Sequence, residues 1–287
     1  MILQSLLVML GLGLACSAVL AVASKLLAVE EDPRVEAVLE ALPGANCGGC
    51  GFAGCESYAA AAVNDPNVPA DRCCAGGAGT AAKVAALTGK AAGSAEPMVA
   101  FRRCAKTEGN VKKLYDYQGV PSCAAAKQLG SPDACGYSCI GLGDCMRACP
   151  FDAMYMAHGM VHVIREKCTA CGNCVRTCPN HIMEIVPQAA RVMVLCSSQD
   201  KGKAVTDVCD AGCISCMKCV KECPAKCIKL EGGVIRIDHA ACIAYGPECQ
   251  EVCAEKCPRS ILRRLGATAE AHAHAHVEPQ AEKEAVA

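Results

Sequence analysis

Apolar residues dominate the first 24 positions of the chain, and no charged side chain interrupts them. A helix of about 20 apolar residues covers the hydrocarbon layer of a bilayer, so residues 1–24 are predicted to form a transmembrane helix. A cleaved signal peptide is the alternative, because small residues occupy positions 21–24. The segment has no positively charged start and exceeds the usual length of a signal peptide's apolar region, which favours the retained helix.

The pattern changes to a helical period after this segment. Val35, Val38, Leu39 and Leu42 recur at helical spacing, and a Pro-Gly pair then ends the pattern. A Gly-rich cysteine loop and a second helix are predicted next, and a short helix around 80–88 leads into a linker.

Two copies of one module follow in the second half of the chain. The interval between two cysteine groups is 23 positions in each copy, from Cys145 to Cys168 and from Cys219 to Cys242. Each copy has a short β-like stretch ahead of its second group, MVHVI in one and VIRID in the other. This repetition predicts a duplicated unit that contains both helices and strands.

The composition indicates that something other than side-chain packing organises the fold. The 287 residues include 27 cysteines, three Phe, six Tyr and no Trp, so the largest contributors of buried area are scarce. Disulfides are one explanation, but runs of C-x2-C that close in Cys-Pro favour metal, and the odd total suits full pairing badly. The net charge of −1, without basic segments interleaved with aromatics, argues against nucleic-acid binding.

The spacing of the cysteines in KCTACGNCVRTCPNH, residues 167–181, predicts which cofactor they bind. In C-x2-C-x2-C-x3-C-P, three thiolates bind one [4Fe-4S] cube, and the cysteine before Pro binds the other cube of a two-cluster fold. Zinc is the alternative, because C-x2-C pairs also make structural zinc sites. Zinc needs only two such pairs and explains neither the third close cysteine nor the Pro.

The crossed-ligand rule assigns sixteen cysteines to four clusters. The spacing around Cys135 and around Cys242 is looser than the usual pattern. The predicted sets are Cys135, Cys139, Cys145 and Cys178; Cys149, Cys168, Cys171 and Cys174; Cys213, Cys216, Cys219 and Cys257; and Cys223, Cys242, Cys249 and Cys253.

An N-terminal C-x2-C-x4-C motif predicts a fifth cluster. Cys47, Cys50 and Cys55 lie among glycines that permit close approach of the backbone to a cofactor. The fourth ligand is Cys73 or Cys74, and we prefer Cys73, although nothing in the spacing settles it. The predicted cofactors are therefore five [4Fe-4S] clusters.

Seven cysteines remain outside these sets, and four of them flank the first module. Those four, which could form a sixth cluster or could be buried free thiols, are Cys104, Cys123, Cys196 and Cys209. Cys16 lies in the apolar segment and is most simply a small hydrophobic residue. The chain contains no nucleophile–base pattern, phosphate loop or flavin signature, so no catalytic residue and no substrate beyond electrons are predicted.

These observations predict an α+β protein in six parts. The parts are a transmembrane helix at 1–24, a small helical 4Fe-4S domain with linker at 25–95, a connecting segment at 96–134, two tandem two-[4Fe-4S] ferredoxin-like modules at 135–190 and 191–265, and a disordered tail at 266–287. Three alternating histidines in the tail, His272, His274 and His276, could bind metal or simply be solvated.

The order of these features resembles one family. From residue 1 to about 265, the chain resembles the B subunit of the Rnf complex. The segments that carry the resemblance are the uncharged span, LPGANCGGCGFAGC, ACGYSCIGLGDCMRACPFDAM and CDAGCISCMKCVKECP. The resemblance implies a subunit of a membrane-bound, ion-translocating ferredoxin:NAD oxidoreductase, a translocase. Such a subunit would take electrons from or give them to soluble ferredoxin and relay them to partner subunits. The duplicated module implies the longer form of the family.

The sequence-based function is thus electron relay on a membrane anchor, as an enzyme subunit without its own substrate site. Reduced thiolates belong on the reducing side of the cell membrane, which predicts cluster domains in the cytoplasm. One alternative is the polyferredoxin subunit of another membrane-bound hydrogenase or reductase. A redox sensor or a structural zinc protein is a further alternative, but no output domain is visible.

Overall fold

The computed structural model describes residues 2–26, 32–91, 93 and 96–265. The predicted disordered tail at 266–287 lies outside these residues. The N-terminal segment forms one helix, α1 (Ile2–Leu26), on which side chains such as Leu10 and Leu20 are exposed. None of the helices in the described part combines the length and apolar character that crossing a membrane requires. The transmembrane helix at 1–24 therefore stays a prediction.

A small unit of three helices, which we call the helical unit, comes next. It consists of α2 (Pro33–Ala41), α3 (Cys55–Asn64) and α4 (Gly77–Thr88), and its core includes Val38 and Val84, both fully buried. Asp32 caps α2 and Pro33 occupies its first turn, a position where the missing N–H costs nothing. The helices predicted around 35–42 and 80–88 are confirmed.

The first module is built around a hairpin and two short helices. The hairpin of β2 (Met154–Ala157) and β3 (Met160–Val163) confirms the strand predicted from MVHVI. The helix α6 (Asp144–Arg147) precedes it, and α7 (Asn173–Thr177) and β4 (Met183–Pro187) follow it. The strand β1 (Met98–Arg102) pairs antiparallel with β4, so the segment before the module completes its sheet.

The second module repeats this plan. Its hairpin joins β6 (Ile228–Glu231) and β7 (Val234–Ile237), as VIRID predicts, and its outer strands pair in the same antiparallel way. The two halves thus share one arrangement of hairpin and outer strands. Its remaining elements are β5 (Val192–Val194), α8 (Lys203–Thr206), α9 (Lys218–Glu222), α10 (His239–Tyr245), the 3-10 turn η1 (Pro247–Cys249), α11 (Val252–Glu255) and β8 (Leu262–Arg264).

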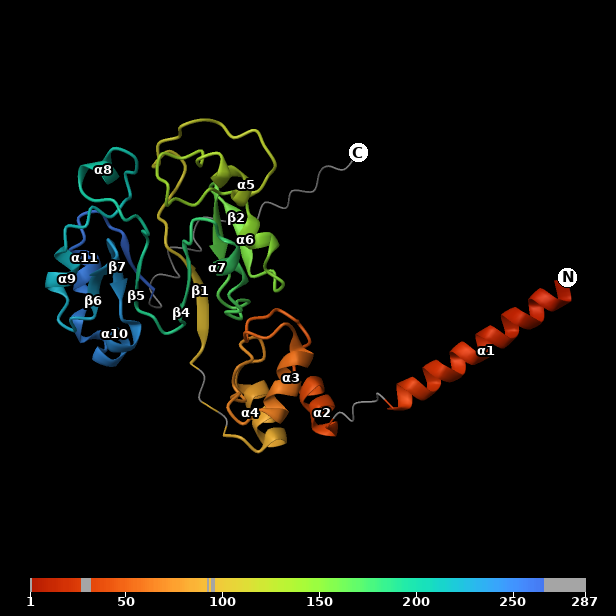
Figure 1. Ribbon diagram of the computed structural model, residues 1–287. Helices are drawn as coiled ribbons and strands as arrows, with labels where there is room; N and C mark the ends of the chain where they lie inside the picture. The colour runs from red at the N-terminus through yellow and green to blue at the C-terminus, as the bar shows by residue number, and fades with distance from the viewer. Residues whose placement is uncertain (1, 27–31, 92, 94–95, 266–287) are drawn as a thin grey trace.

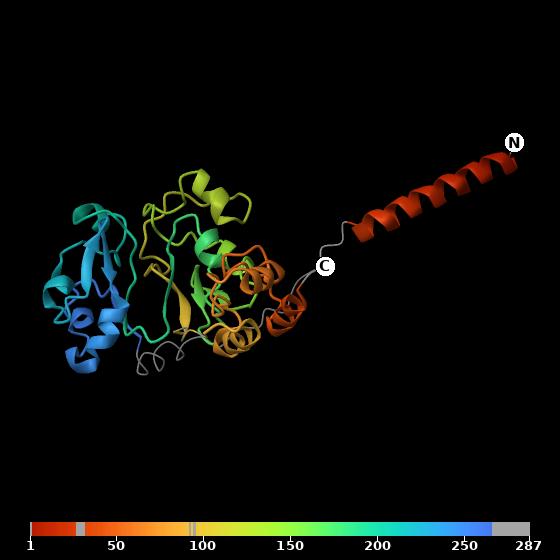
Figure 2. The same cartoon turned by 60° about the horizontal axis from the view of Figure 1, so that its bottom comes forward.

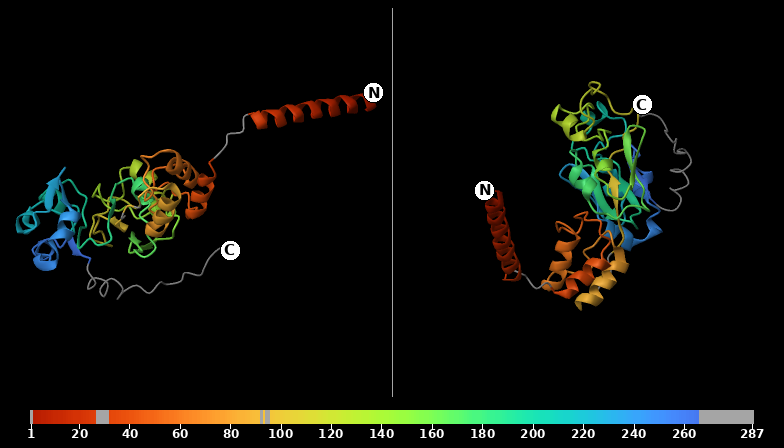
Figure 3. Two further views of the ribbon diagram at one scale, coloured as in Figure 1. Left: turned by 90° about the horizontal axis from the view of Figure 1, so that it is seen from below. Right: turned by 90° about the vertical axis from the view of Figure 1, so that its right-hand side faces the viewer.

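The three units follow one another in space with the first module in the middle (Figures 1, 2 and 3). The buried Arg103 side chain joins the two modules, because its Nη2 donates to the carbonyls of Ile235 at 2.9 Å and Cys196 at 3.3 Å. Its Nε lies 3.3 Å from a carboxylate oxygen of Glu184 in β4. The short helix α5 (Cys123–Gln128) lies on a long loop that returns to the first module.

Candidate iron–sulfur centres

Most of the cysteines are free thiols gathered around cavities. All 27 lie in the described part of the chain, and none of them forms a disulfide there. Five cavities of about 290 to 390 Å³ are each lined by four or five cysteines and otherwise mostly by apolar atoms. Such soft sulfur donors select zinc, copper(I) or iron–sulfur clusters.

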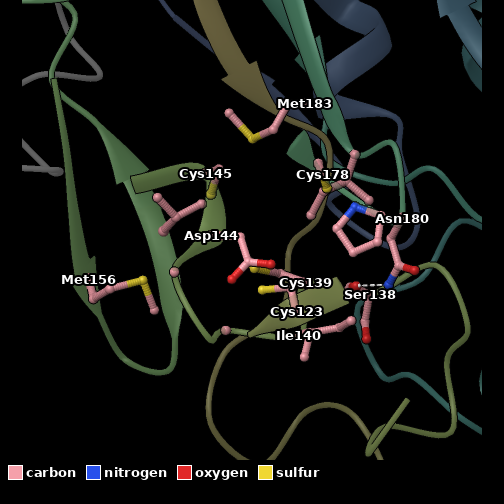
Figure 4. A pocket seen from close by; sticks show the side chains of 15 residues that line it. Cys123, Ser138, Cys139, Ile140, Asp144, Cys145, Met156, Cys178, Asn180 and Met183 are labelled. Carbon is pink, nitrogen blue, oxygen red and sulfur yellow. Dashed lines mark hydrogen bonds between the residues drawn. The ribbon is translucent and has the colours of Figure 1, made fainter. Parts of the chain in front are cut away.

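One cavity, of about 390 Å³, lies in the first module (Figure 4). Cys139, Cys145 and Cys178 line it, as the sequence predicts. The fourth cysteine on its wall is Cys123, whereas Cys135 does not reach it. The apolar remainder of the wall includes Met156, Ile182 and Met183.

Hydrogen bonds to Asp144 explain why Cys123 lies here. The Asp144 carboxylate accepts from the Ser122 hydroxyl and from the Ala124 N–H, both at 3.0 Å, and these two residues flank Cys123. The neighbouring Arg147 donates to the Pro121 carbonyl at 2.6 Å. These contacts hold the start of α5 against α6, which carries Cys145. Spacing along the chain gives no sign of this tie.

Cys135 lies instead with three of the cysteines that flank the module. Burial raises the pKa of the Cys135 thiol to about 12, and negative charge on Cys209, Cys104 and Cys196 adds to the rise. Cys104, Cys196 and Cys209 of the possible sixth set thus lie together. The fourth cysteine beside them is Cys135, not the predicted Cys123.

Two further cavities contain the predicted sets of cysteines and no others. One of about 290 Å³ adjoins α7, and one of about 310 Å³ adjoins α9. Their lining cysteines are Cys149, Cys168, Cys171 and Cys174 in the first case and Cys213, Cys216, Cys219 and Cys257 in the second.

The backbone around these two cavities has the form of an anion nest. Ala170 and Gly172 flank Cys171 with φ of 56° and 77°, and Ser215 and Met217 flank Cys216 with φ of 56° and 62°. Left-handed residues alternating with right-handed ones turn successive N–H groups to one side, a geometry found at many iron–sulfur sites. The left-handed conformation costs a residue with a side chain roughly 1–2 kcal/mol. An anionic occupant of the cavities would account for this strain.

All four Cys-Pro pairs of the modules turn the chain in the same way. The third residue after each cysteine adopts a left-handed conformation, with φ between 47° and 50°. At three of the turns, the N–H of that residue donates to the cysteine carbonyl at 3.1 to 3.2 Å. The turns direct the chain from each cavity into the next strand. The four residues are Asp152, His181, Lys226 and Ser260.

The fourth cavity, about 370 Å³, contains one cysteine more than predicted. Its wall carries the predicted Cys223, Cys242, Cys249 and Cys253 together with Cys227. The Sγ atoms of Cys223 and Cys227 lie 3.5 Å apart. Cys227 follows a Cys-Pro pair by four positions and matches no cluster spacing, so sequence reasoning left it out.

The cavity of the helical unit, about 310 Å³, is lined by Cys47, Cys50, Cys55 and both candidates for the fourth position. Burial raises the pKa of the Cys73 thiol, and charge on the other three cysteines raises it further. Burial raises the pKa of Cys74 to about 12, with contributions from Cys47, Cys73 and also Cys171 of the first module.

Cys73 therefore lies among the three cysteines of the C-x2-C-x4-C motif, while Cys74 lies at the boundary between the units. A Cβ on Gly49 would come within 2.6 Å of the Cys74 Sγ and 2.8 Å of the Cys171 Cα. Only glycine permits this approach of the loop.

A cluster needs more space between its ligands than a single metal ion does. Within the described residues, no three Cys, His, Asp or Glu side chains converge as the ligands of one metal ion do. A cube carries each thiolate on a different iron, so its ligands surround a larger space. The cavity by α7 also presents a buried hydroxyl, Oγ1 of Thr169, that has no hydrogen-bond partner in the described part of the chain.

Burial keeps these thiols from ionising on their own. Burial raises the pKa of Cys145, Cys174 and Cys219 to about 12 each, and the charges of cysteines in the same cavities add to it. At neutral pH these thiols would be protonated without metal, and bound iron would take the place of their protons. Fold and cavities together define an electron carrier of the multi-cluster ferredoxin class.

Comparisons with known proteins agree with this class. Residues 132–179 match the family described as "4Fe-4S dicluster domain", and residues 42–74 match the one described as "Putative Fe-S cluster". The chain is 41% identical over 257 residues to the B subunit of the ion-translocating oxidoreductase complex of Methanosarcina acetivorans, covering 89% of this chain and 97% of that protein. It therefore belongs to the family of B subunits of ion-translocating oxidoreductase complexes, the Rnf family, and the resemblance found in the sequence is confirmed.

Two further relatives carry more specific names. The B subunit of the proton-translocating ferredoxin:NAD(+) oxidoreductase complex of Clostridium ljungdahlii is 40% identical, with 92% of this chain and 93% of that protein covered. The B subunit of the Na(+)-translocating ferredoxin:NAD(+) oxidoreductase complex of Acetobacterium woodii is 41% identical, with 87% and 74% covered.

Proposed function

We propose that this chain relays electrons between ferredoxin and the partner subunits of an Rnf-type complex that couples ferredoxin/NAD chemistry to ion translocation. The observation that carries the proposal is the series of five cysteine-lined cavities running from the helical unit through both modules. Names of two relatives include ferredoxin and NAD, one with protons and the other with Na⁺. The proposal therefore includes a translocated ion without naming it.

Each cavity would hold one [4Fe-4S] cluster, which supplies reversible one-electron transfer when bound. In the first module, the proposed ligands of one cluster are Cys123, Cys139, Cys145 and Cys178. Those of the other are Cys149, Cys168, Cys171 and Cys174. The cavities of the second module and Cys47, Cys50, Cys55 and Cys73 of the helical unit supply the rest. Apolar walls and inward N–H groups lower the exposure of the sulfurs and set the potentials.

The short helices hold neighbouring cavities at fixed separations. Cys174 in α7 lines one cavity and Cys178 at its C-terminal cap lines the other. The same arrangement joins Cys219 and Cys223 around α9. Four residues of helix thus link each pair of sites, which keeps the path for an electron short and rigid.

Contacts at Gly49 support a path from the helical unit into the first module. The loop that carries Cys47 and Cys50 packs against the backbone of Cys171, and Arg176 Nη2 donates to the Cys47 carbonyl at 3.5 Å. The cavity lined by Cys171 would thus be the first stop for electrons that leave the helical unit. Its position favours the helical unit as one terminus of the relay.

Membrane attachment is part of the proposal. The helix α1, which carries no charge before Lys25, would anchor the chain beside the other membrane components of the complex. The cluster-bearing units would lie on the cytoplasmic side, where thiols stay reduced. Soluble ferredoxin and the other Rnf-type subunits are the proposed partners.

The test substitutes one ligand and follows electrons in isolated membranes. Cys168→Ala is expected to remove one cluster, because three thiolates hold a cube poorly, and to block ferredoxin-linked NAD reduction. Cys16→Ala, which changes a cysteine in α1 remote from every cavity, is the matched control and should leave turnover unchanged. Undiminished turnover in the Cys168 variant, with the protein still in the membrane, would contradict the proposed relay.

A further inference from the structure

Four buried or half-buried cysteines remain between the two modules, outside the five cavities. Cys104, Cys135 and Cys196 are 8 to 9% exposed, and Cys209 is partly exposed. They come from four separate segments of the chain, so their meeting is a product of the tertiary fold.

Hydrogen bonds one or two residues away bring these segments together. Lys112 joins two of them, because its N–H donates to Val208 at 3.0 Å and its carbonyl accepts from Ala134 at 2.8 Å. The residues that follow Val208 and Ala134 are Cys209 and Cys135. The Ser197 hydroxyl donates to the Tyr137 carbonyl at 3.3 Å, which brings Cys196 toward Cys135.

Cys104 is tied to the same place from the other side. Arg103, its neighbour in the chain, donates to the Cys196 carbonyl at 3.3 Å. The Cys139 N–H donates to the Cys104 Sγ at 3.4 Å, and the Cys213 N–H donates to the Cys196 Sγ at 3.3 Å. Sulfurs that accept backbone N–H bonds are typical of iron–sulfur ligands, whose potentials these bonds tune.

A buried positive charge lies beside the group. The Arg102 guanidinium lies near Cys104, Cys139 and Cys145. Its Nη1 is buried without a hydrogen-bond partner in the described part of the chain. Buried charges need a partner of opposite sign, and four thiolates around a cube supply one.

We propose that Cys104, Cys135, Cys196 and Cys209 bind a sixth [4Fe-4S] cluster at the junction of the two modules. The proposal rests on the electron relay proposed above. On binding, each thiol releases its proton to solvent as its sulfur bonds to iron, and the iron and sulfide come from the cell's cluster-assembly supply. No electron is gained or lost by the cysteines.

The place of this site gives it a role in the relay. Its sulfurs accept hydrogen bonds from Cys139, which lines a first-module cavity, and from Cys213, which lines a second-module cavity. An electron that leaves one module therefore has an intermediate stop one hydrogen bond from ligands on both sides. The sixth cluster would join two separate pairs of centres into one path.

The first test counts iron and acid-labile sulfide in the full-length chain, purified and reconstituted without oxygen. Each cube holds four of each, so six sites give about 24 irons per chain and five give about 20. A count near 24 is expected. A count near 20 would overturn the sixth site and leave the five-cluster relay standing, whereas a chain without labile sulfide would overturn the relay itself.

Combined substitutions identify the ligands. Cys104→Ala with Cys196→Ala is expected to remove about four irons. Adding Cys135→Ala should remove no more, because it serves the same cluster, whereas adding Cys123→Ala instead should remove about four more. If adding Cys135→Ala removed about four more irons and adding Cys123→Ala removed none, Cys123 and not Cys135 would be the fourth ligand of the sixth cluster, and the set proposed here would be refuted. If the double variant does not fold, the count on the unaltered chain still decides whether the site exists.

Discussion

The five cysteines around the fourth cavity need not all bind iron, and Cys227 is proposed to donate a hydrogen bond instead. It is 4% exposed, and its Sγ lies 3.5 Å from the Sγ of Cys223, a proposed ligand. With iron bound at Cys223, that sulfur would have no proton, so Cys227 would be the donor of this hydrogen bond. Hydrogen bonds to ligand sulfur stabilise the reduced, more negative cluster and raise its potential.

Cys227→Ala is therefore expected to lower the reduction potential of the cluster in the fourth cavity without loss of iron. Cys227→Ser keeps a hydrogen-bond donor, so its reduction potential should be close to that of the unaltered chain. A redox titration followed by electron paramagnetic resonance measures both. Loss of about four irons in the alanine variant would instead show that Cys227 is itself a ligand.

Where cysteines follow one another closely in the sequence, the predicted sets meet around a common cavity. The sets at Cys168 and Cys213 line single cavities as expected, because short spacers leave the chain few alternatives. The exchange of Cys123 for Cys135 depends on Asp144, whose carboxylate binds both neighbours of Cys123. Such a contact across some twenty positions leaves no periodic trace in the sequence.

At the scale of the elements, the loop at Gly49 brings the cavity of the helical unit close to the first-module cavity that Cys171 lines. Gly49→Ala would place a methyl group 2.8 Å from the Cys171 Cα, which backbone cannot accommodate without shifting. Gly79→Ala in α4 is the matched control, because nothing lies within 4 Å of its Cβ position.

Gly49→Ala is expected to slow electron exchange between the helical unit and the first module while iron content stays the same. Rapid mixing of the oxidised chain with a reductant, followed by freezing and paramagnetic resonance, would measure that exchange. Equal rates in the Gly49 and Gly79 variants would show that the relay does not cross this contact.

The hairpins and the main helices could be predicted from the sequence, whereas the outer strand pairs could not. The pairing of β1 with β4 joins Ala100 to Ile185, and that of β5 with β8 joins Met193 to Arg263. Strands of three to five residues carry too little alternation to be recognised, and partners far apart in the chain share no local turn signal. The segment at 96–134, expected only to connect, thus adds a strand to the first module.

At the scale of the whole molecule, Arg103 is a buried polar tie between the modules. Arg103→Met would leave the carbonyls of Cys196 and Ile235 without this donor, at about 1–3 kcal/mol for each buried group. The free energy of opening around β7, measured by amide hydrogen exchange, is expected to fall by about 2–6 kcal/mol.

Arg236→Met provides the comparison, because Arg236 also binds Glu184 but is largely exposed. An exposed ion pair contributes about 0–1 kcal/mol, so exchange around β7 should change little in this variant. Equal effects of the two substitutions would contradict the assignment of Arg103 as the tie.

The central claim is that neighbouring cysteine-lined cavities hold clusters close enough to pass electrons along the chain. Paramagnetic resonance of the fully reduced, full-length protein tests this most directly, because reduced clusters near one another broaden and split each other's signals. We predict an interaction spectrum that narrows when Cys135→Ala and Cys196→Ala remove the centre between the modules. Sharp, independent signals at full iron content, or no cluster signal at all, would contradict the account.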